Sequence, residues 1–264
     1  MTDWGRVAIR VDQAHEGLGH RSFGVTGAVF VRNPELPGIH VANYGHSVTA
    51  ASPAEIDGLL AVAEREFAHC PHRCFEVDSD TPPPFETRLV SDGYEAREFL
   101  MMVLEGELEG RPKDAQLRLA TNDQDWTAAD RLKKLDWAEA RAKLGRDPLP
   151  AVGESLARLA RLKTPPDRKW LAYVDGQARG MASVWDGLDG VGYVEDVFVE
   201  PAYRHRGLAT ALLHRCAADT RARGTRALTL VADADDTPQA MYAAMGFRHA
   251  ATKRRYVWYP KPDC

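Results

Sequence analysis

The sequence predicts a mixed α/β protein built from two domains, and three observations support this prediction. The chain has 264 residues, which exceeds the usual size of one domain and suits two domains of roughly 100 to 150 residues. Its composition, with 44% hydrophobic and 27% charged residues, is typical of a globular protein. The second half alternates strand-like with helix-like patterns, which favours a mixed sheet covered by helices.

Charge and cysteine content argue against several classes of protein. The formal net charge is only −4 with both signs mixed along the chain, so we expect no nucleic-acid partner. No run approaches the ~18 apolar residues of a membrane helix, and the N-terminal segment lacks the apolar core of a signal peptide. Four scattered cysteines do not form a disulfide framework. We therefore expect a cytoplasmic protein without a membrane partner.

Histidine and cysteine are concentrated in a short segment, residues 69–74, which makes it a candidate metal site. It contains His69, Cys70, His72 and Cys74, all of which are potential zinc ligands. A structural zinc site usually needs two separated ligand pairs, and no second pair follows at a zinc-finger spacing. We predict no metal and interpret the segment as a turn between a helix and a strand.

The boundary between the domains is expected at residues 107–114, a polar run that contains Gly110 and Pro112. We therefore place the domains at 1–110 and 113–264.

The elements of the second domain follow from local patterns. Asn122 and its neighbours are suitable N-caps for a helix that extends to Leu144, and a second helix is expected over 154–162. An Asp-Gly turn at 175–176 joins a strand at 169–174 to its antiparallel partner at 178–185. The remaining pattern predicts strand 193–199, helix 207–223, strand 227–232, helix 238–245 and strand 248–259.

A faint internal repeat links the two domains. Residues 77–82 resemble residues 231–238, and in each copy a helix-like stretch follows that ends in glycine and an aromatic residue before a terminal strand. We interpret this as two tandem copies of one fold, with chance similarity around a turn as the alternative.

A cationic turn that contains a glycine connects a strand to a helix near Gly207. The backbone N–H groups of a first helical turn have no intrahelical acceptor, and the helix dipole adds positive charge, so such a turn binds phosphate. Gly207 allows a pyrophosphate to approach the backbone, and Arg204 and Arg206 add full charges. The turn lacks the glycine fingerprint of a dinucleotide site and the lysine of a P-loop.

The motif at 204–209 resembles the acetyl-CoA motif of the GNAT superfamily, Gln/Arg-x-x-Gly-x-Gly/Ala. Upstream, the strand at 193–199 runs into Glu-Pro, as the fourth strand of that family commonly does. Downstream, residues 241–247 are similar to the family's LYxxxGF signature. The resemblance covers about residues 115–260 and implies a GNAT fold with acetyl-CoA as co-substrate.

The resemblance also implies a V-shaped split in the sheet, between the strand that ends at Val199 and the strand at 227–232, where the pantetheine arm of acetyl-CoA lies. An asparagine of the family contacts this arm seven residues before the tyrosine, and Asp235 occupies that position here. The implied cofactor-binding residues are Val197, Phe198 and Val199 for the pantetheine, Arg204, His205, Arg206, Gly207, Leu208, Ala209 and Thr210 for the pyrophosphate, and Asp235.

The acceptor amine needs a group that removes its proton, because an amine with a pKa near 10.4 is almost fully protonated at pH 7. Glu195 and Asp196 lie on the strand that enters the site, and regular alternation allows only one of them to point at the substrate. We favour Glu195 and keep Asp196 open. This acidic pair resembles that of the polyamine and diamine acetyltransferases and implies a cationic acceptor, with a solvated strand end as the alternative.

Tyr242 stands where the family places a tyrosine that protonates the departing CoA thiolate, with an ordinary core tyrosine as the alternative. In the first domain Leu89 takes the corresponding position. There, Ser52, Pro53 and Glu55 form a capping box, which occupies the N–H groups that a phosphate would need. We therefore interpret the first domain as a degenerate lobe without cofactor.

The function expected from these observations is transfer of acetyl from acetyl-CoA to the amine of a small molecule. A non-catalytic acyl-CoA sensor that binds a partner and an acetyltransferase that acts on a protein amine remain alternatives.

Overall fold

The computed structural model describes residues 2–112, 114–234 and 238–260, and the chain divides into two compact units. The first unit contains the residues up to Met101 and the segments that begin at Ala232 and His249. The second unit contains Met102–Val231 and Ala240–Arg248. Neither unit is continuous in sequence.

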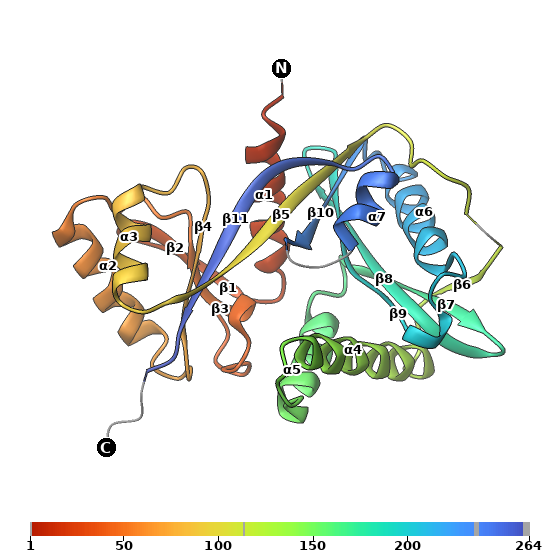
Figure 1. Ribbon diagram of the computed structural model, residues 1–264, viewed down its shortest axis with the longest axis horizontal. Coiled ribbons are helices and arrows are strands. Elements are labelled where there is room, and N and C mark those ends of the chain that lie inside the picture. Colours follow the sequence, from red (N-terminus) through yellow and green to blue (C-terminus); the bar gives the residue numbers. More distant parts are fainter. Residues whose placement is uncertain (1, 113, 235–237, 261–264) are drawn as a thin grey trace. The chain divides into compact units, whose positions relative to one another are not determined.

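The first unit is a mixed sheet with helices on both faces. Its strand order is β1-β2-β3-β4-β11, in which β3 and β4 are parallel and the other neighbours antiparallel. Its elements are α1 (Trp4–Glu16), β1 (Arg21–Val25), β2 (Ala28–Arg32), the 3-10 helix η1 (His40–Ala42), β3 (Asn43–His46), α2 (Pro53–Glu66), β4 (Arg73–Val77), α3 (Pro83–Ser91), the first part of β5 (Glu95–Glu105), and β11 (Arg248–Trp258) from its second residue on (Figure 1).

Alternation along β4 and β11 separates an apolar face from a charged one. Helices α2 and α3 cover the apolar face, whose core includes Phe30, Ile56, Leu59, Phe67, Phe75, Phe85, Leu89 and Tyr256. On the opposite face, Lys253 of β11 donates to Asp12 of α1 at 2.5 Å and to Glu76 of β4 at 3.0 Å, and all three side chains are buried. Arg255 also donates to Glu76, at 2.8 Å. The basic groups of this network thus come from β11 and the acidic groups from the N-terminal part of the chain.

The second unit has the strand order β10-β9-β8-β7-β6, with β9 and β10 parallel and the other neighbours antiparallel. The end of β5 also belongs to it, and Thr229 Oγ1 of β10 donates to the Met102 carbonyl at 3.0 Å. Its elements are β6 (Gln116–Leu119), α4 (Asp123–Lys143), α5 (Pro150–Leu162), β7 (Arg168–Val174), β8 (Gln177–Leu188), β9 (Val191–Val199), the 3-10 helix η2 (Pro201–Tyr203), α6 (Leu208–Arg221), β10 (Ala227–Asp233) and α7 (Pro238–Ala244), whose first two residues are grouped with the first unit.

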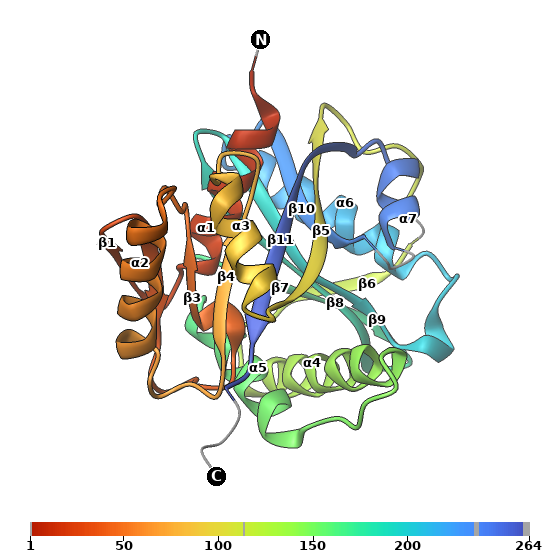
Figure 2. The same ribbon diagram turned by 60° about the vertical axis from the view of Figure 1, so that its left-hand side comes forward.

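Helices cover both faces of this second sheet. Helices α4 and α5 lie on one side of β8 and β9 and α6 lies on the other (Figures 1 and 2). The core under α4 contains Ala129, Leu132, Leu171, Tyr173, Met181 and Phe198.

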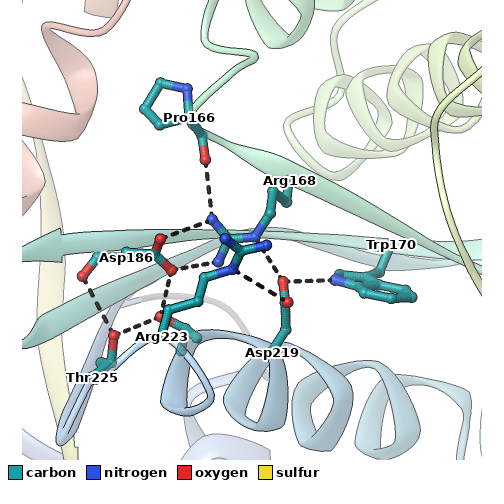
Figure 3. Close-up of polar contacts among 8 residues, drawn as sticks. Pro166, Arg168, Trp170, Asp186, Asp219, Arg223 and Thr225 are labelled. Carbon is teal, nitrogen blue, oxygen red and sulfur yellow. Dashed lines mark hydrogen bonds and ion pairs between the residues drawn. The ribbon is translucent and has the colours of Figure 1, made fainter.

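Arg168 fixes the C-terminal part of α6 to the sheet, as Figure 3 shows. Its guanidinium donates to Asp219 of α6 at 2.7 Å and to Asp186 of β8 at 2.5 Å. Trp170 adds an indole N–H bond to Asp219 at 3.3 Å, and Thr220 of α6 donates to Asp186 at 3.0 Å. The position of the other end of α6, where the cationic turn lies, is thereby set relative to β7 and β8.

The internal repeat is confirmed by equal element order and equal helix ends. Each copy runs strand, helix, glycine, aromatic residue and an eleven-residue strand, as β4-α3-β5 and as β10-α7-β11. Gly93 has a φ of 83° and Gly246 a φ of 95°, which favours glycine. The N–H that follows each glycine bonds the carbonyl five residues back, in Leu89 and in Tyr242, at 3.0 and 3.1 Å.

Several elements had no sequence prediction. We assigned none of α1, β1, β2, β3 and β6, and α5 begins four residues before the predicted start at Glu154. Among the described residues, no helix is both long enough and apolar enough to cross a membrane.

Candidate functional site

Strands β9 and β10 run side by side for only part of their length. Their register pairs Val191 with Ala227 and ends at Val194 with Leu230, although β9 continues to Val199. Within the described part of the chain, the residues of β9 after Val194 have no ladder partner on the β10 side. This agrees with the split that the sequence resemblance implied.

A bulge interrupts β9 just beyond this point. Met181 of β8 pairs with Phe198, but Ser183, two residues further along β8, pairs with Glu195, three residues back along β9. Asp196 has a φ of 56°, so the extra residue adopts the left-handed conformation. Such a bulge leaves backbone groups of β9 unpaired at the place where the strands separate.

The bulge places both carboxylates on one face of β9, where regular alternation would allow only one of them. Residues that pair across neighbouring strands have side chains on the same face of the sheet. Phe198 pairs with Met181, and both pack in the core under α4. Glu195 pairs with Ser183, which is two residues after Met181 and therefore lies on the same face. Asp196 reaches the same face, since it contacts Lys133 of α4. Side chains do not alternate between the two faces of the sheet here, because the bulge inserts one extra residue into β9.

Three lysines neutralise the acidic pair. Lys163 Nζ lies 3.2 Å from Glu195 Oε2, and Lys133 Nζ lies 2.6 Å from Asp196 Oδ1. Lys169 of β7 donates to the other oxygen of Asp196. The side chain of Asp196 is 8% exposed and that of Glu195 is 29% exposed. Glu195 is therefore the more accessible acid.

The two lysines dominate the ionisation of Asp196. Burial opposes its charge, but Lys133 and Lys169 outweigh burial and hold the pKa of Asp196 well below its usual value. A carboxylate with so low a pKa is a poor proton acceptor near neutral pH.

Asp136 is a further carboxylate near the bulge that the sequence did not indicate. It lies one turn after Lys133 on α4, with Lys133 Nζ 3.4 Å from Asp136 Oδ2. Burial raises the pKa of Asp136, and Asp196 adds to this effect while Lys133 opposes it. The only available signal was the Lys-x-x-Asp spacing, which is common on solvated helices.

The turn between β9 and α6 is held by charged side chains. Glu200 accepts from Arg131 of α4 at 2.6 Å and from Arg179 of β8 at 3.0 Å. The Arg179 guanidinium lies 4.6 Å from the centre of the Tyr203 ring, and the Arg206 guanidinium lies 4.9 Å from it. The turn is thus anchored to both α4 and β8.

The first turn of α6 presents backbone N–H groups that no described side chain caps. Gly207 precedes this turn with a φ of 85°, a conformation that favours glycine. In contrast, the Ser52 side chain accepts from the Glu55 N–H at the start of α2, and Glu55 accepts from the Ser52 N–H, which confirms the expected capping box. An uncapped helix N-terminus suits an anion, so the residues present fit the pyrophosphate of acetyl-CoA.

Arg204 is already engaged within the second unit. Its Nε donates to the Val199 carbonyl at 3.0 Å and its terminal nitrogen to Glu139 of α4 at 2.5 Å. Burial opposes ionisation of Glu139, but Arg204 lowers its pKa. The charge that Arg204 offers a phosphate is therefore shared with Glu139, a residue that the sequence did not single out.

Tyr242 lies on α7 and is 6% exposed, with its ring edge-on to Phe247 at a centroid distance of 6.0 Å. It belongs to the same compact unit as the β9 bulge and the α6 turn. Asp235, the last expected cofactor contact, lies outside the described residues. The catalytic and cofactor-binding roles of the site residues remain predictions.

The segment at 69–74 is a helix-to-strand connection, as expected. Cys70 and Cys74 are both buried, and burial raises the pKa of the Cys74 thiol to about 12. Among the described residues, no three histidine, cysteine, aspartate or glutamate side chains are grouped so that they can hold a metal ion.

Comparison with known families identifies the second unit. Residues 129–247 match the model of the acetyltransferase (GNAT) family. These residues form a GNAT domain, and members of this family are acetyltransferases. A comparison with curated proteins found no match.

Solved structures show the same architecture over nearly the whole chain. A GCN5-related N-acetyltransferase from Kribbella flavida has a TM-score of 0.67 at 20% identity, with 97% of this chain and 96% of that chain covered. A functionally unknown conserved protein from Staphylococcus epidermidis has a TM-score of 0.70 at 15% identity, with coverages of 92% and 95%. A tandem GNAT protein from the clavulanic acid biosynthesis pathway has a TM-score of 0.60 at 15% identity, with coverages of 92% and 82%. The chain therefore has a tandem GNAT fold.

Proposed function

We propose that this protein is an acetyl-CoA-dependent N-acetyltransferase of the cytoplasm that acts on the amine of a small molecule. The uncapped N-terminus of α6, which follows a strand that parts from β10 after Val194, carries this proposal. The amides of the turn at 204–210 bind the pyrophosphate, and backbone groups of Val197, Phe198 and Val199 bind the pantetheine and the thioester carbonyl. Acetyl-CoA supplies the activated acetyl group.

Direct transfer follows from this arrangement. The neutral amine attacks the thioester carbonyl and the C–N bond forms. The nitrogen then releases its extra proton to solvent, and the C–S bond breaks as the thiolate leaves. Tyr242 gives its proton to the thiolate, a transfer from a pKa of ~10 to one of ~8.5 that is uphill by about 2 kcal/mol. The Tyr242 phenolate then regains a proton from solvent.

The acceptor must lose a proton before it attacks. An amine with a pKa near 10.4 is neutral in about one part in two thousand at pH 7, which costs roughly 4 to 5 kcal/mol without help. Glu195, directly or through a water molecule, accepts this proton in the proposed mechanism. Its exposed fraction makes it the accessible member of the acidic pair.

We further propose that the acceptor is cationic and meets Glu195. Lys163 already contacts this carboxylate, so an acceptor ammonium must compete with an internal lysine. The attraction is therefore weaker than the acidic pair alone suggested, and it depends on Glu195 since Asp196 is enclosed by two lysines.

The test uses the full-length protein. Calorimetry should show binding of acetyl-CoA, and thiol release should appear with at least one member of a panel of polyamines, amino acids and peptides. Binding without turnover across the panel would favour an acyl-CoA sensor, and turnover with peptides alone would indicate a protein substrate.

Gly207→Glu is the matched variant, because a side chain and a negative charge would both enter the pyrophosphate site. We expect acetyl-CoA affinity to fall by about a hundredfold, or ~2.7 kcal/mol. A folded Gly207→Glu protein that binds acetyl-CoA as tightly as the wild type would contradict the assignment of this turn.

A further inference from the structure

The side chain of the bulged residue in β9, Asp196, forms ion pairs with two lysines that lie on other elements. Asp196 accepts from Lys133 of α4 through one carboxylate oxygen and from Lys169 of β7 through the other. The two lysines come from different elements of the same unit, and the Lys169 side chain is only 1% exposed. The single residue with the left-handed backbone conformation in β9 is thus tied to both a helix and a strand.

The backbone conformation and the burial of Asp196 are each unfavourable, and the ion pairs with the two lysines offset this cost. A residue other than glycine at positive φ is unfavourable relative to the same residue in a regular strand. A carboxylate with 8% of its side chain exposed also loses most of its hydration, which only close charged partners compensate. The carboxylate and its lysines are therefore best explained as a device that keeps the bulge in place.

The position of the bulge gives this device a role in the reaction. The bulge lies directly after Val194, where pairing with β10 ends, and directly before Val197 and Phe198. In the proposed function these residues offer backbone groups to the thioester. Their direction depends on the backbone conformation of Asp196, because in a strand without the extra residue those groups would point to the opposite side.

We propose that Asp196 is a positioning residue: clamped by Lys133 and Lys169, it fixes the β9 bulge and so sets the direction in which the backbone groups that follow the bulge face the thioester, while it does not take the acceptor's proton. Lys133 and Lys169 act as positioning residues through Asp196. This inference rests on the proposed function and assigns the pair Glu195 and Asp196 two different tasks.

Kinetics of single and double variants separate positioning from proton transfer. Asp196→Asn keeps a residue that tolerates positive φ but weakens the ion pairs with both lysines. Lys133→Met removes one of the two ion pairs, and the Lys133 side chain that it replaces is 18% exposed. Each should lower kcat by about 10²-fold, the loss typical of one misplaced oxyanion donor, with KM for acetyl-CoA within about threefold of wild type. The acidic limb of the pH–rate profile should persist in both.

The double variant Asp196→Asn/Lys133→Met provides the decisive comparison. Because both changes break the same clamp, its kcat should be no lower than that of the more damaged single variant. Glu195→Gln is the matched control, since it changes the neighbouring carboxylate without touching the clamp. Loss of the acidic limb in Asp196→Asn, or a Lys133→Met enzyme with wild-type kcat, would overturn the proposal.

Amide hydrogen exchange supplies a measurement that does not depend on activity. In the Lys133→Met protein the amides of Val197 and Phe198 should exchange at least tenfold faster than in the wild type, while those of α6 stay unchanged. Unchanged exchange at 197 and 198 overturns the clamp even if the wild type shows no turnover. Absence of wild-type turnover with faster exchange would contradict the proposed function alone.

Discussion

Tyr242 and Glu195 are the two side chains of the second unit whose proposed tasks can be separated most directly. Tyr242 is buried against Phe247, so its ring has a packing role in addition to its hydroxyl group. The side chain of Glu195 is 29% exposed and pairs with Lys163. One residue is expected to act on the leaving group and the other on the acceptor.

Tyr242→Phe removes the hydroxyl and keeps the ring. We expect kcat to fall by about 10² to 10⁴-fold because the CoA thiolate loses its proton donor, while acetyl-CoA affinity changes little. Steady-state kinetics with the best acceptor, together with calorimetry, check this. Full turnover in a folded Tyr242→Phe protein would leave only the packing role.

Glu195→Gln should raise KM for a cationic acceptor and reduce the salt dependence of that KM, because an attractive charge is lost. If Glu195 also accepts the proton, kcat falls and the acidic limb of the pH profile disappears. Kinetics between pH 6 and 9 at two ionic strengths distinguish these effects. Unchanged kinetics throughout would exclude both roles for Glu195.

At the level of helices and strands, local sequence signals predicted the turns and helix starts that depend on residues close together in the chain. The glycine at 207, the helix-capping residues at 52 and 55 and the Asp-Gly turn at 175–176 all act within a few residues, and the structure places the expected elements around them. The bulge at Asp196 and its lysines were not predictable in this way. Lys133, Lys169 and Asp196 are far apart in the chain, and none of them belongs to a recognisable motif.

The anchored helix α6 can be tested through Arg168, whose side chain is 13% exposed between Asp186 and Asp219. Arg168→Met removes the guanidinium that joins the two carboxylates, so we expect a loss of about 3 kcal/mol, or a Tm lower by roughly 6 to 10 °C. Arg248→Ala is the control, since its ion pair with Glu105 is largely exposed and should contribute little. Equal Tm values for both variants would contradict the anchoring role.

For the molecule as a whole, two histidines in the first unit, His40 and His72, predict how stability depends on pH. Burial, together with His72 and Arg255, lowers the pKa of His40 to about 3. Burial is also the main cause that lowers the pKa of His72 to about 4, and Arg73 and His69 add to it. The two rings lie edge to face with centroids 4.5 Å apart.

Because these folded-state pKa values lie below the ordinary value of about 6.5, the unfolded chain binds more protons than the folded one. Stability from His40 and His72 is complete above pH 6.5 and declines as the pH falls, by ~2 kcal/mol for each histidine at pH 5. Thermal unfolding from pH 7.5 to 5 should show this decline, and His40→Gln should reduce its slope. A Tm that is flat over this range would contradict the prediction.

The overall division of the chain was only partly predictable, because the repeat of β4-α3-β5 as β10-α7-β11 was visible in the sequence but the final placement of β11 was not. Its pairing with β4 depends on residues more than a hundred positions away in the chain, such as Tyr256 opposite Phe75. No local pattern encodes such a partner, although Lys253 and Arg255 carry the charges that pair with Asp12 and Glu76.

This placement of β11 has a consequence for the order of events on the ribosome. Chains usually fold from the N-terminus as they are made, yet the first unit contains buried Asp12 and Glu76 whose basic partners are translated only after the whole of the second unit. Until Lys253 and Arg255 emerge, closing the first unit would bury carboxylates without counter-charges, which is strongly unfavourable. We therefore expect the first unit to close only after β11 has been translated, and a premature stop codon anywhere before residue 253 to disable the lobe that was synthesised first.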